Sequence, residues 1–183
     1  GVGCDQLIRL EAPADGRAHL FIRILNADGS EAEACGNAAL CVAQRAMAET
    51  GTESVMLETA AGLIEARAGA DGAITVDMGP PALDWRDIPL ASEADTLELD
   101  IQAGPLRGPS AVGMGNPHMV FFVDDAEAID LDALGPELEH HPIYPNRANV
   151  EVVAVTAPGR LRMRVWERGV GITPACGSGT CAA

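Results

Sequence analysis

Two stretches of the sequence follow one plan: RILNADGSEAEACG at residues 23–36 and RVWERGVGITPACG at residues 164–177. Each opens at the end of a strand-like run, passes through a loop that contains glycine and closes on Ala-Cys-Gly. The two cysteines, Cys35 and Cys176, are 141 residues apart, and the same offset pairs the arginines that open the stretches. Small residues follow both cysteines, where a helix is expected to begin. The repeat therefore predicts two units of similar local structure.

Short strand-like runs dominate the remainder of the chain, and helices are few. The predicted strands are His19–Leu25, Val55–Thr59, Leu63–Arg67, Ala73–Met78, Thr96–Ile101, Met119–Val123, Asn149–Thr156 and Arg160–Trp166. Helices are predicted at Ala38–Glu49, which is rich in alanine, and at Leu131–Leu138. Gly79-Pro80-Pro81 is the predicted boundary between units, because two prolines cannot continue a central strand. The pattern is typical of an α+β fold rather than of alternating βαβ units.

Composition excludes several classes of partner and chemistry. The 183 residues carry a formal net charge of −15, so the surface would repel nucleic acid and anionic membranes. All 12 basic residues are arginine, and lysine is absent. Without lysine the chain has no Schiff-base partner for pyridoxal phosphate and no phosphate-loop lysine. We therefore expect a small-molecule ligand, no nucleic acid, no membrane and no cofactor.

The five cysteines and the chain ends suggest a location and a boundary. No run of about 18 apolar residues occurs, and no basic-then-apolar leader opens the chain. An odd number of cysteines without C-x-x-C spacing fits neither a disulfide framework nor structural zinc. We expect a soluble, cytoplasmic protein with reduced thiols and no metal. Because the chain starts at Gly1 without methionine and stops after a glycine-rich turn, we also expect it to be a fragment.

A cysteine at a helix N-terminus faces unpaired backbone N–H groups and the positive end of the helix dipole. These groups favour the thiolate and can also bind a carboxylate. Two such units facing one another would place Cys35 and Cys176 on opposite sides of one bound acid. One thiolate could then remove a proton from the α-carbon, and the other thiol could return a proton to the opposite face. Backbone N–H groups at the carboxylate would stabilise the developing negative charge.

Simpler interpretations stand beside this one. A single cysteine is more often an inert, buried apolar residue, and we interpret Cys4, Cys41 and Cys181 in that way. A disulfide between Cys35 and Cys176 is a further alternative. Gly177-Ser178-Gly179-Thr180 taken alone predicts only a turn.

Seven strings occur in an order that resembles one known family. They are Gly1-Val2-Gly3-Cys4-Asp5-Gln6-Leu7-Ile8, Asn26-Ala27-Asp28-Gly29-Ser30, Ala34-Cys35-Gly36-Asn37, Gly115-Asn116-Pro117-His118, Asn149-Val150-Glu151, Trp166-Glu167-Arg168-Gly169 and Ala175-Cys176-Gly177-Ser178-Gly179-Thr180. Together they closely resemble the diaminopimelate epimerase family, whose members use two cysteines and no cofactor. The similar segments span nearly the whole chain.

The resemblance implies an isomerase that interconverts LL- and meso-2,6-diaminopimelate, in lysine and peptidoglycan precursor synthesis. It makes Cys35 and Cys176 the catalytic acid–base pair, supported by His118 and Glu167. The substrate-binding residues that it implies are Asn26, Gly36, Asn37, Asn116, Asn149, Glu167, Arg168, Gly177 and Ser178. The implied fold has two similar domains, each a mixed sheet curled as a barrel or roll around a central helix, with the active site in the cleft between them. A homodimer is the assembly that it suggests.

The resemblance divides the chain into an N-terminal domain, 1–80, and a C-terminal domain, 81–183. The first would lack its opening strand and the second its segments after Cys176, so this stretch alone is expected to bind substrate weakly or to be inactive. Many members of the family carry arginine where Leu40 stands and glutamate where Ile172 stands. Two rival functions remain: another two-thiol racemase, acting on proline, hydroxyproline, aspartate or glutamate, and a non-enzymatic ligand-binding or thiol-redox module.

Overall fold

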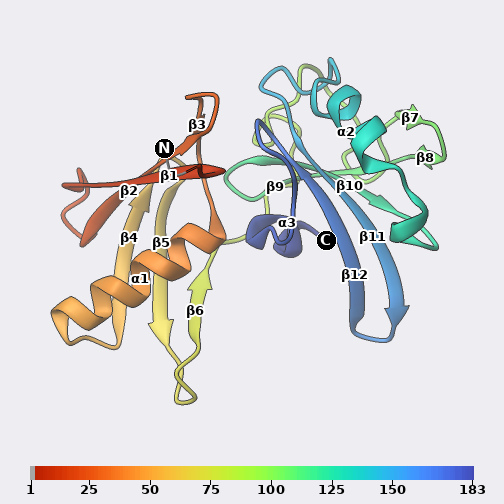
Figure 1. Ribbon diagram of the computed structural model, residues 1–183. Coiled ribbons are helices and arrows are strands. Elements are labelled where there is room, and N and C mark those ends of the chain that lie inside the picture. The colour runs from red at the N-terminus through yellow and green to blue at the C-terminus, as the bar shows by residue number, and fades with distance from the viewer. Residues whose placement is uncertain (1–2) are drawn as a thin grey trace. The chain divides into compact units, whose positions relative to one another are not determined.

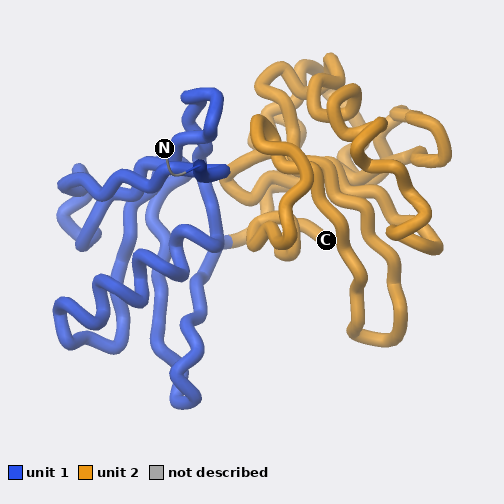
Figure 2. The backbone as a smooth tube through the Cα atoms, in the orientation of Figure 1, with its two compact units in different colours: residues 1–79 blue, residues 80–183 orange. Residues whose placement is uncertain are grey.

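The computed structural model describes residues 3–183, so Gly1 and Val2 of the first family string lie outside the described residues. The chain divides into two compact units, residues 1–79 and residues 80–183 (Figure 2). Each unit contains mixed β-sheet and few helices, which is an α+β fold. None of the described helices is long and apolar enough to cross a membrane.

A mixed sheet and one long helix make up the first unit. Its strands are β1 (Gln6–Glu11), β2 (Leu20–Asn26), β3 (Glu31–Ala32), β4 (Ser54–Thr59), β5 (Gly62–Ala68) and β6 (Ile74–Asp77). They follow the order β1-β2-β4-β5-β6, with β3 paired to the C-terminal end of β2. Only the β2–β4 pair is parallel. The helix α1 (Gly36–Thr50) packs across β4, β5 and β6 (Figure 1).

Helix α1 confirms the helix predicted at Ala38–Glu49 and extends it at both ends. Its buried face is made of small and apolar residues at helical spacing, including Ala39, Val42, Ala46 and Met47. The helix ends at Gly51, which has a left-handed backbone (φ 70°) and donates its N–H to the carbonyl of Met47 at 2.8 Å.

The second unit is built on a five-stranded sheet and a small two-stranded one. Its elements are β7 (Gln102–Ala103), β8 (Leu106–Arg107), β9 (Ser110–Gly113), β10 (Pro117–Phe122), the 3-10 turn η1 (Ala126–Ala128), α2 (Leu131–Glu139), β11 (Asn149–Ala157), β12 (Arg160–Glu167), β13 (Gly171–Thr173) and α3 (Gly177–Ala182). The large sheet runs β13-β12-β11-β10-β9, and only β10 and β11 are parallel. Helix α2 packs against β11, β12 and β13.

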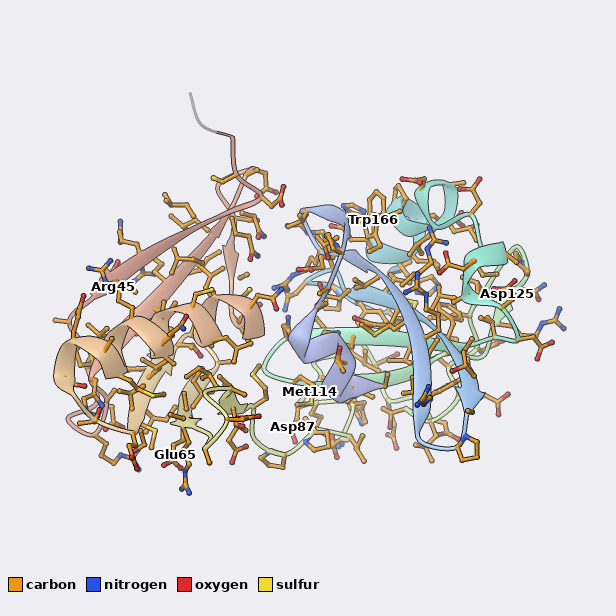
Figure 3. All side chains as sticks on the ribbon, turned by 60° about the horizontal axis from the view of Figure 1, so that its bottom comes forward. Arg45, Glu65, Asp87, Met114, Asp125 and Trp166 are labelled. Carbon is orange, nitrogen blue, oxygen red and sulfur yellow. The ribbon has the colours of Figure 1, made fainter. Side chains whose placement is uncertain are left out.

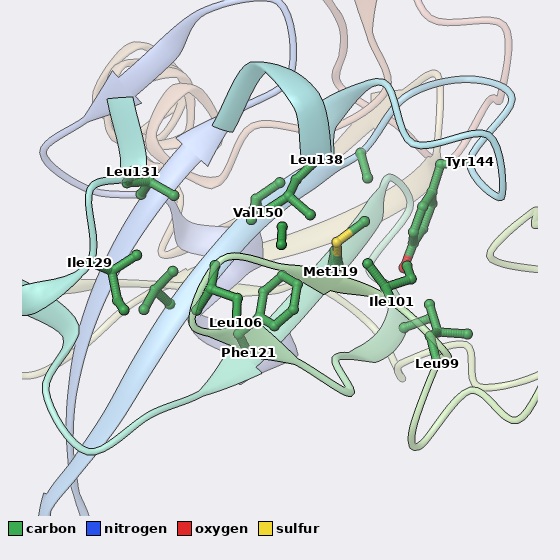
Figure 4. Close-up of a cluster of buried hydrophobic side chains, with 14 of the residues drawn as sticks. Leu99, Ile101, Leu106, Met119, Phe121, Ile129, Leu131, Leu138, Tyr144 and Val150 are labelled. Carbon is green, nitrogen blue, oxygen red and sulfur yellow. The ribbon is translucent and has the colours of Figure 1, made fainter. Parts of the chain in front are cut away.

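The core of the second unit is aliphatic with few aromatic rings. Met119 and Phe121 of β10 are fully buried, and they pack with Leu106 and Val150 (Figure 4). Tyr144 closes one end of this cluster and donates its hydroxyl to the carbonyl of His118 at 3.2 Å. This core fixes the start of β10, where the Asn-Pro-His string lies.

The strand predicted at Thr96–Ile101 is wrong. Leu99 and Ile101 are buried, and this alternation suggested a strand. Instead the backbone follows turns: the carboxylate of Asp95 accepts from Leu97 N at 3.0 Å, and Ile101 N donates to the carbonyl of Leu99 at 2.8 Å. Local bonds to Asp95 thus replace the pairing that a strand would need. The other predicted strands and the helix at Leu131–Leu138 are confirmed within a few residues at their ends.

The sequence repeat is also a repeat of strand register. In the first unit Ile24 pairs with Ala32 and Leu25 with Glu31. In the second unit Val165 pairs with Thr173 and Trp166 with Ile172, which is the same pairing displaced by 141 residues. Each short return strand leads to the cysteine, and each cysteine leads to a helix. The two cysteines therefore occupy equivalent positions in their own units.

Candidate active site

Cys176 is the N-cap residue of helix α3 and has extended backbone angles (φ −128°, ψ 114°). Its Sγ accepts a hydrogen bond from Gly179 N at 3.4 Å and lies 3.5 Å from Ser178 Oγ. The residue is only 7% exposed. The thiol thus lies where the unpaired N–H groups of the helix begin, as the sequence predicted.

The pKa of Cys176 is raised to about 12, so the expected shift toward thiolate is wrong for this cysteine. Burial is the largest cause, because it disfavours the charged form. The carboxylates of Glu167 and Glu151 raise the pKa further, and the hydrogen bonds from Ser178 and Gly179 only partly oppose them. Cys176 is therefore a thiol at neutral pH, which suits a proton donor.

We expect iodoacetamide at about pH 8 to alkylate Cys176 at least about tenfold more slowly than Cys41 or Cys181. The raised pKa leaves little thiolate at Cys176, whereas Cys41 and Cys181 are exposed. Peptide mass spectrometry after timed quenching measures each site separately. In urea the three rates should converge, and equal rates in the folded protein would contradict the assignment of Cys176 as a buried thiol.

Cys35 holds the matching position in the first unit. It is the N-cap residue of α1, with extended backbone (φ −149°, ψ 107°), and its carbonyl accepts from Ala39 N at 3.0 Å. Cys35 is half-buried at the edge of the unit's core. Gly36, which follows it, is buried, and Asn37 is exposed. Backbone N–H groups of the first helical turn are thus presented beside the thiol in this unit as well.

Asn26 is buried at the end of β2, close to the hairpin that leads to Cys35. Its Oδ1 accepts from Gln6 Nε2 at 2.9 Å, and its Nδ2 donates to Ser30 Oγ at 3.1 Å. Among residues 3–183 these two bonds use one lone pair of Oδ1 and one N–H of Nδ2.

Asn149 connects two segments of the second unit. Its Nδ2 donates to the carbonyl of Pro117 at 3.2 Å, and its Oδ1 accepts from Arg168 N at 2.9 Å. Arg168 is buried, and its Nη1 donates to the carbonyl of Asn146 at 3.1 Å. These bonds hold the start of β10 and the turn after β12 together.

Glu167 occupies the last position of β12 and accepts a short hydrogen bond from Thr173 Oγ1 on β13. Its carboxylate is one of the two that raise the pKa of Cys176. Ser178, in the first turn of α3, is almost fully buried beside the same thiol. The structure thus brings Glu167, Cys176 and Ser178 together in the second unit.

His118 lies within hydrogen-bond distance of two protein groups instead of a thiol. Its Nδ1 lies 2.7 Å from Glu151 Oε1, and its Nε2 lies 2.8 Å from Asn116 Oδ1. Both His118 and Glu151 are completely buried. Glu151 also lies against helix α3, because a Cβ at Gly179 would stand 2.6 Å from its Oε1. Only glycine fits at that position without displacing the carboxylate.

Glu139 is an organising residue that the sequence did not single out. This buried carboxylate accepts from Trp166 Nε1 at 2.7 Å and from Gly169 N at 2.9 Å, and it pairs with Arg147 Nη1 at 3.2 Å. It therefore shapes the turn that carries Glu167 and Arg168. Helical spacing could have revealed it, because the buried positions of α2 are Leu131, Gly135, Leu138 and Glu139.

Other cysteines and two departures from the family pattern lie at the surface. The interpretation of Cys4, Cys41 and Cys181 as buried residues is wrong, since all three are exposed. None of the five cysteines forms a disulfide. Leu40 and Ile172 are also exposed, at 36% and 42%, and nothing in the structure explains their replacement of charged residues. Within residues 3–183, no cluster of His, Cys, Asp or Glu has the geometry to hold a metal ion.

Comparison with known proteins identifies the family. A family model described as diaminopimelate epimerase matches residues 1–83 and 110–183. The diaminopimelate epimerase of Rhodospirillum centenum is 60% identical over 182 residues, and that of Acidiphilium cryptum is 52% identical over 183 residues. Both alignments cover 100% of this chain, but only 62% and 65% of those relatives, so the chain spans less than two thirds of their length.

Solved structures share the fold at lower identity. A hydroxyproline epimerase from Agrobacterium vitis has a TM-score of 0.70 at 20% identity, covering 97% of this chain and 58% of that one. A PhzF-family phenazine biosynthesis protein from Bacillus anthracis has a TM-score of 0.57 at 16% identity, covering 97% of this chain and 64% of that one. The fold is therefore shared with racemase-like and PhzF-like proteins, and the sequence match places this chain in the diaminopimelate epimerase family.

Proposed function

We propose that this chain carries the two catalytic cysteines of a diaminopimelate epimerase, which interconverts the LL and meso forms of 2,6-diaminopimelate without a cofactor. One observation carries the proposal: Cys35 and Cys176 cap equivalent helices in units whose strand registers repeat at an offset of 141 residues. Residues 1–80 and 81–183 would supply one catalytic half each. Membership of the family supports the assignment.

The proposed reaction is a proton exchange at one carbon. In one direction the thiolate of Cys35 takes the α-proton, the C–H bond breaks and its electron pair moves into the substrate carboxylate as an enolate. Cys176 then gives its S–H proton to the opposite face, so that the first cysteine ends as a thiol and the second as a thiolate. The reverse reaction exchanges the two roles. The raised pKa of Cys176 supports its part as the resting acid.

Binding of the reacting carboxylate falls, in this proposal, to backbone N–H groups at the two helix starts. Gly36 and Asn37 would contribute them from α1, and Gly177 and Ser178 from α3. Such donors stabilise negative charge as it develops on the enolate.

The distal amino-carboxylate end of the substrate would be bound by four of the polar residues described above: Asn26, Asn116, Asn149 and Arg168. A guanidinium group can bind a carboxylate through two parallel hydrogen bonds. Asn149 would act partly by holding Arg168, whose backbone N–H it accepts. Because proline and glutamate have no second amino-carboxylate end, this cluster favours the longer substrate.

A cytoplasmic location and a homodimer complete the proposal, without nucleic-acid or membrane partners. The net charge of −15 supports the last two exclusions. Light scattering of the intact protein tests the dimer.

Solvent isotope exchange tests the function. The protein at its natural length, with reduced thiols, is incubated in heavy water with stereoisomers of diaminopimelate, proline or glutamate. We expect deuterium to enter the α-carbon of diaminopimelate only, because the two thiols exchange their protons with solvent between turnovers. Exchange on proline alone would assign the chain to a different racemase. Exchange on none of them would leave a ligand-binding or redox protein.

A further inference from the structure

The Asn116, His118 and Glu151 side chains form a chain of buried polar groups in the second unit. Asn116 and His118 are two residues apart at the start of β10, so their side chains lie on the same side of the backbone. In the strand register, His118 of β10 is opposite Asn149 of β11. Glu151 is two residues beyond Asn149 in β11 and therefore projects from the same face as His118. The contacts of 2.7 Å and 2.8 Å follow from this register.

The donor and acceptor roles of these three side chains follow from which of their atoms can carry a hydrogen. Asn116 Oδ1 can only accept, so His118 Nε2 must carry a hydrogen. At the other ring nitrogen one further proton is shared between His118 Nδ1 and Glu151 Oε1. Whichever atom holds that proton, Nε2 keeps its hydrogen and the pair has no net charge.

Burial excludes the competing arrangement. If His118 carried a hydrogen on Nδ1 alone, Glu151 would be either a carboxylate with no compensating charge or an acid with its hydrogen on Oε2, although its side chain is fully buried. Its Oε2 is buried without a hydrogen-bond partner among the described residues, which raises the cost of the charge in the first case and leaves a buried O–H unsatisfied in the second. Glu151 thus selects the state of His118 in which Nε2 donates.

The consequence reaches Asn116. Since Oδ1 is turned toward His118, the NH2 group of Asn116 points the other way. Among the described residues this Nδ2 has no hydrogen-bond partner. It is also absent from the fully buried side-chain atoms that lack a partner, so Nδ2 itself is not fully buried. An NH2 group that is not fully buried and has a free N–H is a donor and suits a ligand oxygen, such as that of a carboxylate.

We propose that Glu151 is a positioning residue for substrate recognition: through His118 it turns the side-chain amide of Asn116 so that NH2, not oxygen, faces a ligand carboxylate. This inference rests on the proposed function for the identity of the ligand. The orientation of the Asn116 amide is argued independently of the proposed function.

Glu151→Gln is the decisive variant, because it keeps the size of the side chain and removes the charge. Glutamine can accept from a hydrogen on Nδ1 as well as donate to an unprotonated Nδ1, so the ring is no longer restricted to the state with its hydrogen on Nε2. Where Nδ1 carries the hydrogen, Nε2 accepts and Asn116 turns its NH2 inward. We expect KM for diaminopimelate to rise about tenfold, with a much smaller change in kcat, because a hydrogen bond to a charged group is lost. Glu127→Gln is the matched control: it removes an exposed carboxylate that pairs with Arg162, and it should change neither constant.

Nitrogen NMR of the histidine rings reads the mechanism directly. In the unsubstituted protein His118 should carry hydrogen on Nε2, and in Glu151→Gln a ring with hydrogen on Nδ1 alone should appear. His118→Gln assigns the signals, since it removes one of four histidines.

A ring protonated on Nδ1 alone in the unsubstituted protein would overturn the proposal without any variant, and so would an unchanged KM in a folded Glu151→Gln protein. If the ring signals are as expected but the protein does not turn over diaminopimelate, the proposed function is wrong, while the orientation of Asn116 is supported.

Discussion

Replacing Cys176 by serine is expected to slow epimerisation of diaminopimelate by about three orders of magnitude or more, and Cys35→Ser should have an effect of the same size. A serine hydroxyl holds its proton far more tightly than a thiol, so at neutral pH it can neither form the base nor readily give its proton to the substrate. Both residues cap helices in equivalent positions, and in the proposed mechanism each face of the substrate needs one of them. Chiral analysis of the product over time measures the loss.

Cys41→Ser provides the control for these two variants. Cys41 lies on the exposed side of α1, in the same helix that Cys35 caps, so its loss should leave turnover within about twofold. In heavy water, product formed early should contain deuterium at the α-carbon, while unreacted substrate should not. Similar losses from all three cysteine variants would contradict the assignment of Cys35 and Cys176 as the acid–base pair.

Gly135→Ala is expected to destabilise the second unit by about 3 kcal/mol. A Cβ at this position of α2 would stand 2.4 Å from one ring atom of Trp166 and 2.5 Å from another. The indole, which is labelled in Figure 3, cannot easily move away, because its Nε1 donates to the buried carboxylate of Glu139. Denaturant unfolding followed by circular dichroism gives the change in midpoint.

The sign of this effect is informative. Helix propensity alone would make alanine more stable than glycine inside a helix by about 1 kcal/mol, so a loss of stability reports the close approach of α2 to Trp166. Gly16→Ala is the matched control, since a Cβ there would meet nothing within 4 Å. If Gly135→Ala were as stable as Gly16→Ala, the packing of α2 on β12 described here would be wrong.

Strongly periodic elements were predicted well from the sequence. Helix α1 has a long alanine-rich face, and β11 and β12 flank the Pro158-Gly159 turn with alternating residues. Strands β1, β3, β7, β8, β9 and β13 were not predicted, and all of them except β1 have four residues or fewer. Both faces of β1 are partly exposed, and β13 has only three residues, so neither shows a period long enough to detect.

At the candidate site the sequence predicted the local backbone structure better than the electrostatics. Both cysteines lie at helix starts, as their small neighbours indicated. The direction of the Cys176 pKa shift was wrong, because the local effect of the helix is outweighed by burial and by carboxylates on β11 and β12. The role of Glu139 was missed for the same reason: its partners come from segments outside its own helix.

By itself, the sequence determined the internal repeat, the two cysteine positions and the absence of lysine, because these are properties of residue identity and spacing. Tertiary structure alone decided that Cys176 is a thiol, that His118 is enclosed between Asn116 and Glu151, and that Glu139 is buried. The physical reason is that desolvation and charge–charge interaction depend on distance in space. Strand pairing brings together groups that are far apart along the chain.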